Sequence, residues 1–236
     1  MAEYMIVPTD SIDATADAIK AKLGSQNDLV WGQDGFADYV DDIPSGGTDY
    51  LVERCEGTLT SYESDEVTKL TSSCFSELSA LVSVKLHNVT VTNGNAFMNT
   101  SVVNIAFPKI VTLGNQTFYR ARLLEKVDLG GTITSNIGNT AFMDCNALNI
   151  IVLRKNGLIP LASTSTFNNT PFKSGGTGGA IYIPKSLYDH LGDSTSNDYK
   201  AATNWSTIDG YGTITWAQIE GSYYETHYAD GTLIPT

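Results

Sequence analysis

The residue types that most often carry chemistry are few in this chain and widely scattered. The three histidines, His87, His190 and His227, lie at no spacing that would join two of them on one metal ion. Serine, aspartate and histidine could be combined into so many triads that none of them stands out. The phosphate-binding GxxxxGK[ST], dinucleotide-binding GxGxxG and zinc-binding HExxH motifs are absent from the sequence. The sequence therefore predicts a protein that is not an enzyme.

The cysteines and the paired carboxylates are interpreted as structural residues. Cys55, Cys74 and Cys145 are odd in number and have no CxxC spacing, so they support neither a disulfide framework nor a zinc site. We expect buried thiols, because free cysteine is among the most buried residue types. Carboxylate pairs such as Asp41–Asp42 are expected to be solvated, and no DxDxDG-type calcium loop is present. We therefore expect neither a metal ion nor a cofactor.

The negative charge of the chain is concentrated in its first quarter. The formal net charge is −12 over 236 residues, and residues 1–66 hold 15 Asp and Glu against 3 Lys and Arg. An acidic or neutral surface repels phosphate backbones, which argues against nucleic acid as a partner. No apolar run approaches the ~18 residues that a membrane helix needs, and the first residues lack the pattern of a secretion signal. We expect no membrane insertion and no export by that route.

A repeat occupies the middle of the chain. The segment CFSELSALVSVKL, Cys74–Leu86, returns as AFMDCNALNIIVL, Ala141–Leu153. In both, a Phe is followed after six residues by Leu, after nine by Val or Ile and after eleven by Leu. The second copy is one residue short, and in the last copy a GGTGG insertion delays the strand to Ile181–Ile183. The copies follow one another at intervals of 22, 21, 24 and 25 residues and are anchored by Phe75, Phe97, Phe118, Phe142 and Phe167.

A period in the twenties predicts a solenoid. Each unit has one short strand whose alternate residues point inward, and a single strand cannot bury that face alone. Stacking the next unit on it gives a continuous core with parallel pairing of the strands. We expect about five coils, with the five phenylalanines stacked in one interior column. Short β-like segments such as VTKL and IVTL precede the phenylalanines.

The run from Tyr62 to Ile183 resembles the BspA-like leucine-rich repeats of phage tail-associated proteins and of bacterial surface proteins. The form AF-x-x-C-x-x-L-x-x-[IV]-x-L is best kept in AFMDCNALNIIVL, where Cys145 stands on the family's buried cysteine position. LVERCEGTLTSYESDEVTKL is similar to the family's lead-in, and IYIPKSLYDHLGDSTSNDYKAATNWSTI is similar to its exit. The resemblance implies a β-rich α/β fold. It implies a leucine-rich-repeat solenoid of short parallel strands at 67–184, after a lead-in at 48–66.

A small helical module is expected before the repeats, at residues 1–47. Its apolar residues follow helical spacing, and the Gly-rich joint Pro44–Gly47 closes it. The module resembles a segment that often opens phage tail-associated proteins. It could anchor the protein to an assembly, or it could only cap the open end of the solenoid core. The residues that would form the anchor are Ile12, Ile19, Leu23, Phe36 and Tyr39.

Aromatic residues gather in the region 185–236, which we expect to cap the repeats with a helix and an aromatic-rich end. Six Trp and Tyr residues lie between Trp205 and Tyr228. They could stack against sugar rings, but closure of the last coil is the favoured interpretation, because aromatic rings bury a large area. His227 and Asp230 are too isolated to be interpreted as catalytic. The candidate binding residues in this region are Trp205, Trp216 and Tyr224.

The outer face of the expected sheet supplies the other candidate binding residues. In each strand, the residue between the two inward positions belongs to a column that should face solvent. The column mixes charged, aliphatic and aromatic side chains, which is typical of a recognition surface or a neutral spacer. It consists of Lys85, Ala106, Asp128, Val152 and Tyr182, of which Lys85, Asp128 and Tyr182 are the candidate contact residues.

The resemblance, together with the missing secretion signal, implies a non-enzymatic virion protein of a tailed phage, in the tail, baseplate or a fibre, that displays the repeats for host recognition or adhesion. The expected partners are other virion proteins at residues 1–47, a glycan or protein of the host surface, and sister copies in a trimer. The protein would be assembled in the host cytoplasm and located in the virion. The alternatives are an adhesin on the bacterial cell surface, a capsid decoration protein and, least favoured, a polysaccharide-degrading enzyme.

Overall fold

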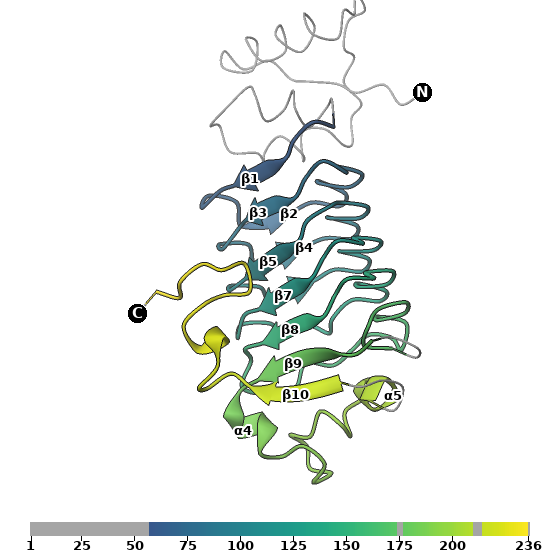
Figure 1. Ribbon diagram of the computed structural model, residues 1–236, viewed down its shortest axis with the longest axis vertical. Helices are drawn as coiled ribbons and strands as arrows, with labels where there is room; N and C mark the ends of the chain where they lie inside the picture. The colour runs from purple at the N-terminus through teal and green to yellow at the C-terminus, as the bar shows by residue number, and fades with distance from the viewer. Residues whose placement is uncertain (1–56, 174–176, 210–213, 236) are drawn as a thin grey trace, which may run out of the picture.

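The computed structural model describes residues 57–173, 177–209 and 214–235, and within them the chain winds into coils stacked along one axis (Figure 1). The expected N-terminal module at 1–47 and Cys55 lie outside the described residues. The same holds for the candidate anchor residues Ile12, Ile19, Leu23, Phe36 and Tyr39.

A parallel sheet of seven strands runs along one side of the stack, in the order β1-β3-β5-β7-β8-β9-β10. The inward residues of successive strands lie in register, with Ile105 opposite Val127 and Val127 opposite Ile151. A solenoid of short parallel strands is therefore confirmed. The strands are β1 (Ser61–Glu63), β3 (Ser83–Lys85), β5 (Asn104–Phe107), β7 (Lys126–Leu129), β8 (Ile150–Leu153), β9 (Gly179–Ile183) and β10 (Ile214–Gln218).

This main sheet extends beyond the five copies of the repeat. β1 lies in the segment expected to be only a lead-in, yet Tyr62 pairs in register with Val84 of β3. The strand delayed by the glycine insertion is β9, and Ile181 still lies opposite Ile151. β10 follows the repeats and adds a last parallel strand beside β9. The register therefore survives where the sequence spacing changes.

Two further hydrogen-bond ladders join the coils. The first is a three-stranded parallel sheet formed by segments that precede the phenylalanines: β2 (Lys69–Leu70), β4 (Val91–Thr92) and β6 (Thr112–Leu113). The second lies on the turn side, where main-chain amides donate to carbonyl groups of the next coil. The amide of Phe97 donates to the carbonyl oxygen of Thr117 at 2.7 Å, and the amide of Phe118 donates to the carbonyl oxygen of Ala141 at 2.9 Å.

The turn ladder accounts for left-handed backbone at residues other than glycine. This conformation is unfavourable for a residue that has a Cβ. In the turns, the left-handed conformation directs alternate main-chain amides along the stack. The hydrogen bonds that these amides form between coils offset the conformational cost. Side chains at these positions also pair, since Asn99 donates to Glu77 at 2.7 Å and Asn169 to Asp144 at 2.6 Å. The residues two places after the phenylalanines have φ of +66°, +56°, +60°, +64° and +56°: Glu77, Asn99, Arg120, Asp144 and Asn169.

The phenylalanine column fills the interior, as predicted. Neighbouring ring centroids are 5.2, 5.4, 5.5 and 5.2 Å apart, and the planes of neighbouring rings differ by at most 12°. No ring of the column is more than 5% exposed. Cys74 and Cys145 are both buried, also as predicted, and Cys145 is a free thiol. Burial raises the pKa of the Cys145 thiol far above its ordinary value.

Two glycines allow the main chains of adjacent coils to approach closely. A Cβ on Gly130 would lie 1.7 Å from the carbonyl oxygen of Pro108, and one on Gly138 would lie 2.2 Å from that of Gly114. Any side chain at these positions would therefore push the coils apart.

Aromatic residues close the last coil, which confirms the favoured interpretation for Trp205 and Trp216. Trp205, at the start of α5 (Trp205–Asp209), is fully buried, and its ring lies 5.7 Å from that of Phe167. Its indole N–H donates to the carbonyl of Ile159 at 2.6 Å, and the amide of Ile159 donates to the Tyr199 hydroxyl at 3.2 Å. Trp216 packs on Trp205 at 6.0 Å. The short helix α4 (Lys185–Tyr188) connects β9 to this cap.

Candidate functional site

The C-terminal segment, residues 219–235, covers much of the outer face of the main sheet. After β10 the chain turns back and crosses the strands towards β3, as the yellow trace in Figure 1 shows. The 3-10 helix η1 (Tyr223–Glu225) lies near its start. The segment contacts Tyr182 of β9, Val152 of β8 and Asp128 of β7. The candidate site is therefore formed by the sheet and this segment together.

The segment ends in a C-terminal hairpin, residues 226–234. His227 and Leu233 form an antiparallel bridge, and the amide of Tyr228 donates to the carbonyl of Thr232 at 2.8 Å. Gly231 at the turn has a φ of +87°, which glycine adopts without strain. The Asp230 carboxylate accepts a hydrogen bond from the Thr232 amide at 2.9 Å. The run Ala-Asp-Gly thus forms the turn that reaches the sheet.

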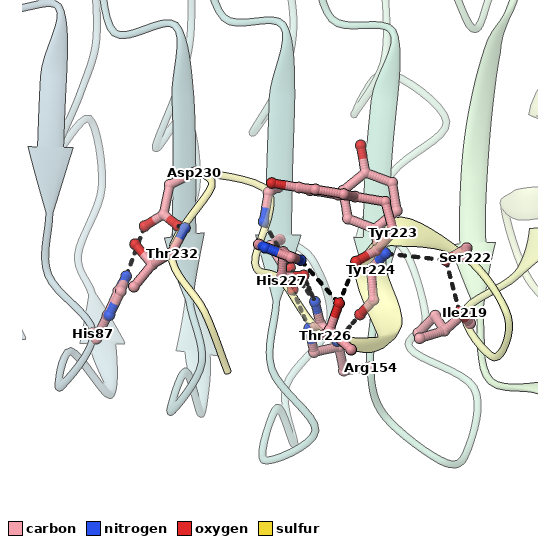
Figure 2. Close-up of polar contacts among 12 residues, drawn as sticks. His87, Arg154, Ile219, Ser222, Tyr223, Tyr224, Thr226, His227, Asp230 and Thr232 are labelled. Atoms are coloured by element: carbon pink, nitrogen blue, oxygen red, sulfur yellow. Dashed lines mark hydrogen bonds and ion pairs between the residues drawn. The ribbon is translucent and has the colours of Figure 1, made fainter. Parts of the chain in front are cut away.

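A buried ion pair fixes this hairpin to the sheet. The Arg154 guanidinium donates through Nε and Nη2 to the two carboxylate oxygens of Asp128, both at 2.7 Å. Arg154 also donates to the carbonyl oxygens of Tyr224 at 2.8 Å and His227 at 2.9 Å (Figure 2). The amide of Ala229 in turn donates to Asp128 at 3.1 Å. The pair therefore holds the main chain of the segment.

The ion pair is shielded from water. The side chain of Asp128 is 0% exposed and that of Arg154 is 15% exposed. Burial raises the pKa of the Asp128 carboxyl, while the hydrogen bonds and charge of Arg154 and the amide of Ala229 oppose that shift. Removing either partner would leave an uncompensated buried charge, which is far more destabilising than losing an exposed ion pair.

A second polar contact holds the tip of the hairpin. The Nε2 atom of His87 lies 2.6 Å from the Asp230 carboxylate, and these side chains are 23% and 5% exposed. The ring of Tyr228 lies 5.3 Å from that of His87, and the Arg154 guanidinium lies over Tyr228 at 5.1 Å. Burial works against ionisation of Asp230, but hydrogen bonds from His87 and Thr232 outweigh it, so its pKa is lowered.

A small apolar cluster under the segment completes the contact. It is separate from the main core and contains Val152, Ile219, Tyr224 and Ala229, with Ile150 and Tyr182 packed against it. The rings of Tyr182 and Tyr224 meet edge to face at 4.6 Å. The outer face thus has its own apolar contacts, and they are not repeated from coil to coil.

The prediction that the middle column of the sheet faces solvent is wrong for three of its five residues. Ala106, Asp128 and Val152 are at most 1% exposed, and the C-terminal segment packs on Asp128 and Val152. Asp128 is therefore a structural residue and cannot contact a partner. Lys85 on β3 is exposed and pairs with Glu63 at 3.4 Å. Tyr182 is partly exposed.

The candidate binding role is also wrong for two of the three C-terminal aromatics. Trp205 is 0% and Tyr224 is 5% exposed, so neither presents a ring to a ligand. Trp216 is only partly exposed and packs on Tyr199 at 5.5 Å inside the cap. These rings are buried because they supply apolar area to the cap and to the small apolar cluster.

Sequence reasoning missed Arg154 and His87, which anchor the segment. The available signal was an aspartate in the middle of an apolar strand, since a carboxylate is rarely buried without a partner. Arg154 lies 26 residues after Asp128 in the sequence, and His87 and Asp230 are 143 residues apart. The strand register brings Arg154 to Asp128, and the path of the C-terminal segment brings Asp230 to His87.

A row of four rings leads from the apolar cluster under the segment to the exposed side of the segment, and it was not predicted as a unit. We call Tyr182, Tyr224, Tyr223 and His227 the aromatic row. Tyr223 is 54% exposed, lies flat on His227 with 4.2 Å between centroids and 12° between planes, and meets Tyr224 edge-on at 5.4 Å. Figure 2 shows Tyr223, Tyr224 and His227 together on this segment.

The part of the chain that the structure describes contains no group of three or more His, Cys, Asp or Glu residues arranged to hold a metal ion. No helix within the described ranges has the length and apolar character needed to cross a membrane.

Coils of twenty-odd residues, a parallel strand in each coil and a stacked phenylalanine column define a leucine-rich-repeat solenoid. The model of the BspA type leucine rich repeat region matches residues 48–174 in six copies, one more than the five anchored by phenylalanine. This match spans more than half of the chain, and the chain belongs to that family.

Among solved structures, a leucine-rich repeat protein from Bacteroides ovatus is similar at 16% identity with a TM-score of 0.30. The similarity covers 68% of this chain and 54% of that one. No curated protein matches the chain.

Proposed function

We propose that the protein is a non-enzymatic recognition protein that binds its target with the outer surface formed by the main sheet and the C-terminal segment. One observation carries the proposal. The inner side of the segment is occupied by anchoring contacts, whereas on its outer side Tyr223 stays 54% exposed in an orientation fixed by His227 and Tyr224. A rigid aromatic group on a solvated surface is typical of a binding site, since little conformational freedom is lost on association.

The polar groups of the same surface support binding rather than catalysis. Asp128 and Arg154 are both committed to holding the main chain of the segment. His87 is paired with Asp230. The titratable groups nearest to the aromatic row therefore have structural partners, and a solenoid that presents a large continuous surface is suited to recognition.

We place this recognition protein in a tailed-phage virion, in the tail, baseplate or a fibre, where it would contact a glycan or protein of the host surface. Residues 1–47 would join it to other virion proteins and to sister copies in a trimer, since assemblies of this kind are generally symmetric. The support is the resemblance of the repeats and of the first segment to phage tail-associated proteins, together with the excess of acidic residues before residue 67. The protein would then be assembled in the host cytoplasm and carried in the virion.

The test uses the full-length protein and antibodies raised against it. Fluorescent protein should bind host cells in a saturable manner, and immunogold should label the tails of phage particles from cultures that carry the coding sequence. Label on the bacterial envelope without particles would identify an adhesin instead, and label on the head would identify a capsid decoration protein. Absence of cell binding would overturn the recognition function. Release of reducing sugars from host polysaccharide would overturn the non-enzymatic assignment.

A further inference from the structure

The aromatic residues near the C-terminus fall into two groups that differ in the state of their polar atoms. In the cap, the Trp205 indole N–H and the Tyr199 hydroxyl are both hydrogen-bonded to the main chain of Ile159. In the aromatic row, the hydroxyl groups of Tyr182 and Tyr223 have no hydrogen-bond partner among the residues that the structure describes. The cap therefore satisfies its polar atoms internally, whereas the row leaves them to solvent or to a ligand.

Tyr223 is held in place although half of it is exposed. One face of its ring lies flat on His227 at 4.2 Å, and the planes of the Tyr223 and Tyr224 rings are at 87° to each other. With one face covered and 54% of the residue exposed, the opposite face is available to a ligand. A ring fixed in this way is preorganised, so binding costs little side-chain entropy.

His227 adds a polar atom beside this ring. Its Nδ1 atom lies 2.9 Å from the hydroxyl oxygen of Thr226, which fixes the orientation of the imidazole. Its Nε2 atom has no hydrogen-bond partner within the described part of the chain. The surface thus combines an open apolar ring face with a phenol hydroxyl and an imidazole nitrogen at its rim.

These features favour a sugar ring as the ligand. A hexopyranose has an apolar face of C–H groups that can lie on an aromatic plane, and hydroxyl groups around its edge that donate and accept hydrogen bonds. A few polar groups placed around an apolar contact are typical of sites that bind small molecules.

The charges around the row indicate a neutral sugar. The Arg154 charge is compensated by Asp128, with which it forms two hydrogen bonds. Glu225, next to the row on η1, is exposed and would repel a carboxylate or sulfate group. A uronic acid or a sulfated sugar would therefore bind less well than an uncharged one.

We propose that Tyr223 and His227 form a binding site for a neutral hexopyranose unit of a surface glycan. This inference rests on the proposed recognition function and names the class of ligand for its surface. Stacking on Tyr223 provides the apolar contact, and the Tyr223 hydroxyl and His227 Nε2 contact the sugar hydroxyl groups.

The test titrates the full-length protein with cellotetraose, maltotetraose, mannotetraose and chitotetraose, and follows tyrosine fluorescence and calorimetric heat. At least one of them should bind with a Kd in the millimolar range or tighter. Tyr223→Ala should weaken that binding at least about tenfold, and Tyr223→Trp should retain it. The matched control is Tyr188→Ala, which removes a tyrosine that is 37% exposed on α4 and outside the row. Both alanine variants should keep the melting temperature of the wild type, because neither side chain is buried.

The other outcomes separate this inference from the function on which it rests. If an oligosaccharide binds Tyr223→Ala as tightly as the wild type, the sugar site is not at the row and the inference is wrong. If none of the four binds while the protein still adheres to host cells, recognition stands and the neutral-sugar site is overturned. If the protein binds neither oligosaccharides nor cells, the inference and the proposed function both fail.

Discussion

The inner and outer faces of the main sheet are stabilised in different ways. The inner face repeats one arrangement, in which each coil adds inward strand residues and one phenylalanine ring 5.2 to 5.5 Å from the next. Much of the outer face is covered by a single segment, the C-terminal one. This segment is held by the Asp128–Arg154 pair, the His87–Asp230 contact and a cluster of six apolar residues. The inner face therefore determines the fold, and the outer face determines which part of the sheet a partner can reach.

The two faces of the sheet should also respond differently to substitutions. In a repeat array, each coil depends on its neighbours, so a lost interior contact weakens the whole stack. The segment on the outer face depends on a few single contacts and can detach while the coils remain folded. Substitutions on the inner face should therefore lower global stability, and those on the outer face should be seen first in the local exposure of the hairpin.

The largest effect is expected for Phe142→Ala, on the inner face. Phe142 is fully buried and stacks on Phe118 at 5.5 Å and on Phe167 at 5.2 Å. Its removal leaves a cavity and should lower the free energy of unfolding by roughly 3–5 kcal/mol, measured by urea denaturation. Leu123→Ala is the control, because Leu123 is 53% exposed and should change the same quantity by less than about 0.5 kcal/mol. Equal losses in the two variants would contradict the stacked column.

The second-largest effect is expected for Arg154→Leu, on the outer face. The substitution leaves the Asp128 carboxylate buried without its partner and removes two donors to the segment. Breaking a buried pair costs about 3–5 kcal/mol when the site stays closed, and about 2–3 kcal/mol is expected here because the hairpin can detach. Hydrogen exchange should show faster exchange of the Ala229 and Tyr228 amides. Unchanged exchange would mean that the pair does not hold the segment.

The stability of the same variant should depend on pH more strongly than that of the wild type. Burial already raises the pKa of Asp128, and Arg154 is the main group that opposes this rise. Without Arg154 the raised pKa increases further, and stability is then present at low pH and lost as pH rises through that pKa. The deficit of Arg154→Leu should therefore be smaller in acid than at neutral pH. The double variant Asp128→Leu/Arg154→Leu should recover part of the loss and should lack this pH dependence.

A smaller effect is expected where adjacent coils meet, at Gly130→Ala. The new methyl group would lie 1.7 Å from the carbonyl oxygen of Pro108, so the main chain must shift. Such overpacking should lower the free energy of unfolding by roughly 1–3 kcal/mol. Gly157→Ala is the matched control, since its methyl group would meet only the end of the Lys155 side chain at 3.7 Å. If both variants were as stable as the wild type, the coils would not be as closely packed as the structure indicates.

The inner face could be predicted from the sequence because its signal is periodic. One phenylalanine per coil and alternating apolar residues after it are sufficient to assign the strands, their direction and the ring column. The shortened copy after Phe97 and the glycine insertion before β9 did not disturb this, since the excess or missing length is absorbed in the connections.

The outer face could not be predicted in the same way. The rule that residues between inward positions face solvent holds for a bare sheet. It failed at Asp128 and Val152 because a segment from the far end of the chain lies on them. The pairing of Asp128 with Arg154 follows from the strand register and could have been inferred from it. The contact between His87 and Asp230 also depends on the path of the C-terminal segment, which no local pattern specifies.

The smallest effect concerns the tip of the hairpin and is tested with His87→Ala. In the folded protein the pKa of Asp230 is lowered, since hydrogen bonds from His87 and Thr232 outweigh the effect of burial. A carboxyl group with a lowered pKa stabilises the fold above its ordinary pKa of 3.8, and this stability is lost as pH falls through the lowered value. The hairpin of the wild type should therefore stay protected at neutral pH and open only in acid, below about pH 4.

In His87→Ala the burial of Asp230 remains but its strongest hydrogen bond is gone, so the carboxyl should titrate at a higher pH and the hairpin should open earlier as pH falls. At neutral pH the lost hydrogen bond should destabilise the closed hairpin by roughly 0.5–1.5 kcal/mol. The carboxyl carbon shift of Asp230 in an NMR titration and the exchange rate of the Gly231 amide measure the two effects. His190→Ala is the matched control, because it removes a similar contact with Asp193 at 2.7 Å between exposed side chains away from the hairpin. If both histidine variants left the Asp230 titration unchanged, the His87 contact would not stabilise the ionised carboxyl, and the hairpin would be held by Arg154 and the apolar cluster alone.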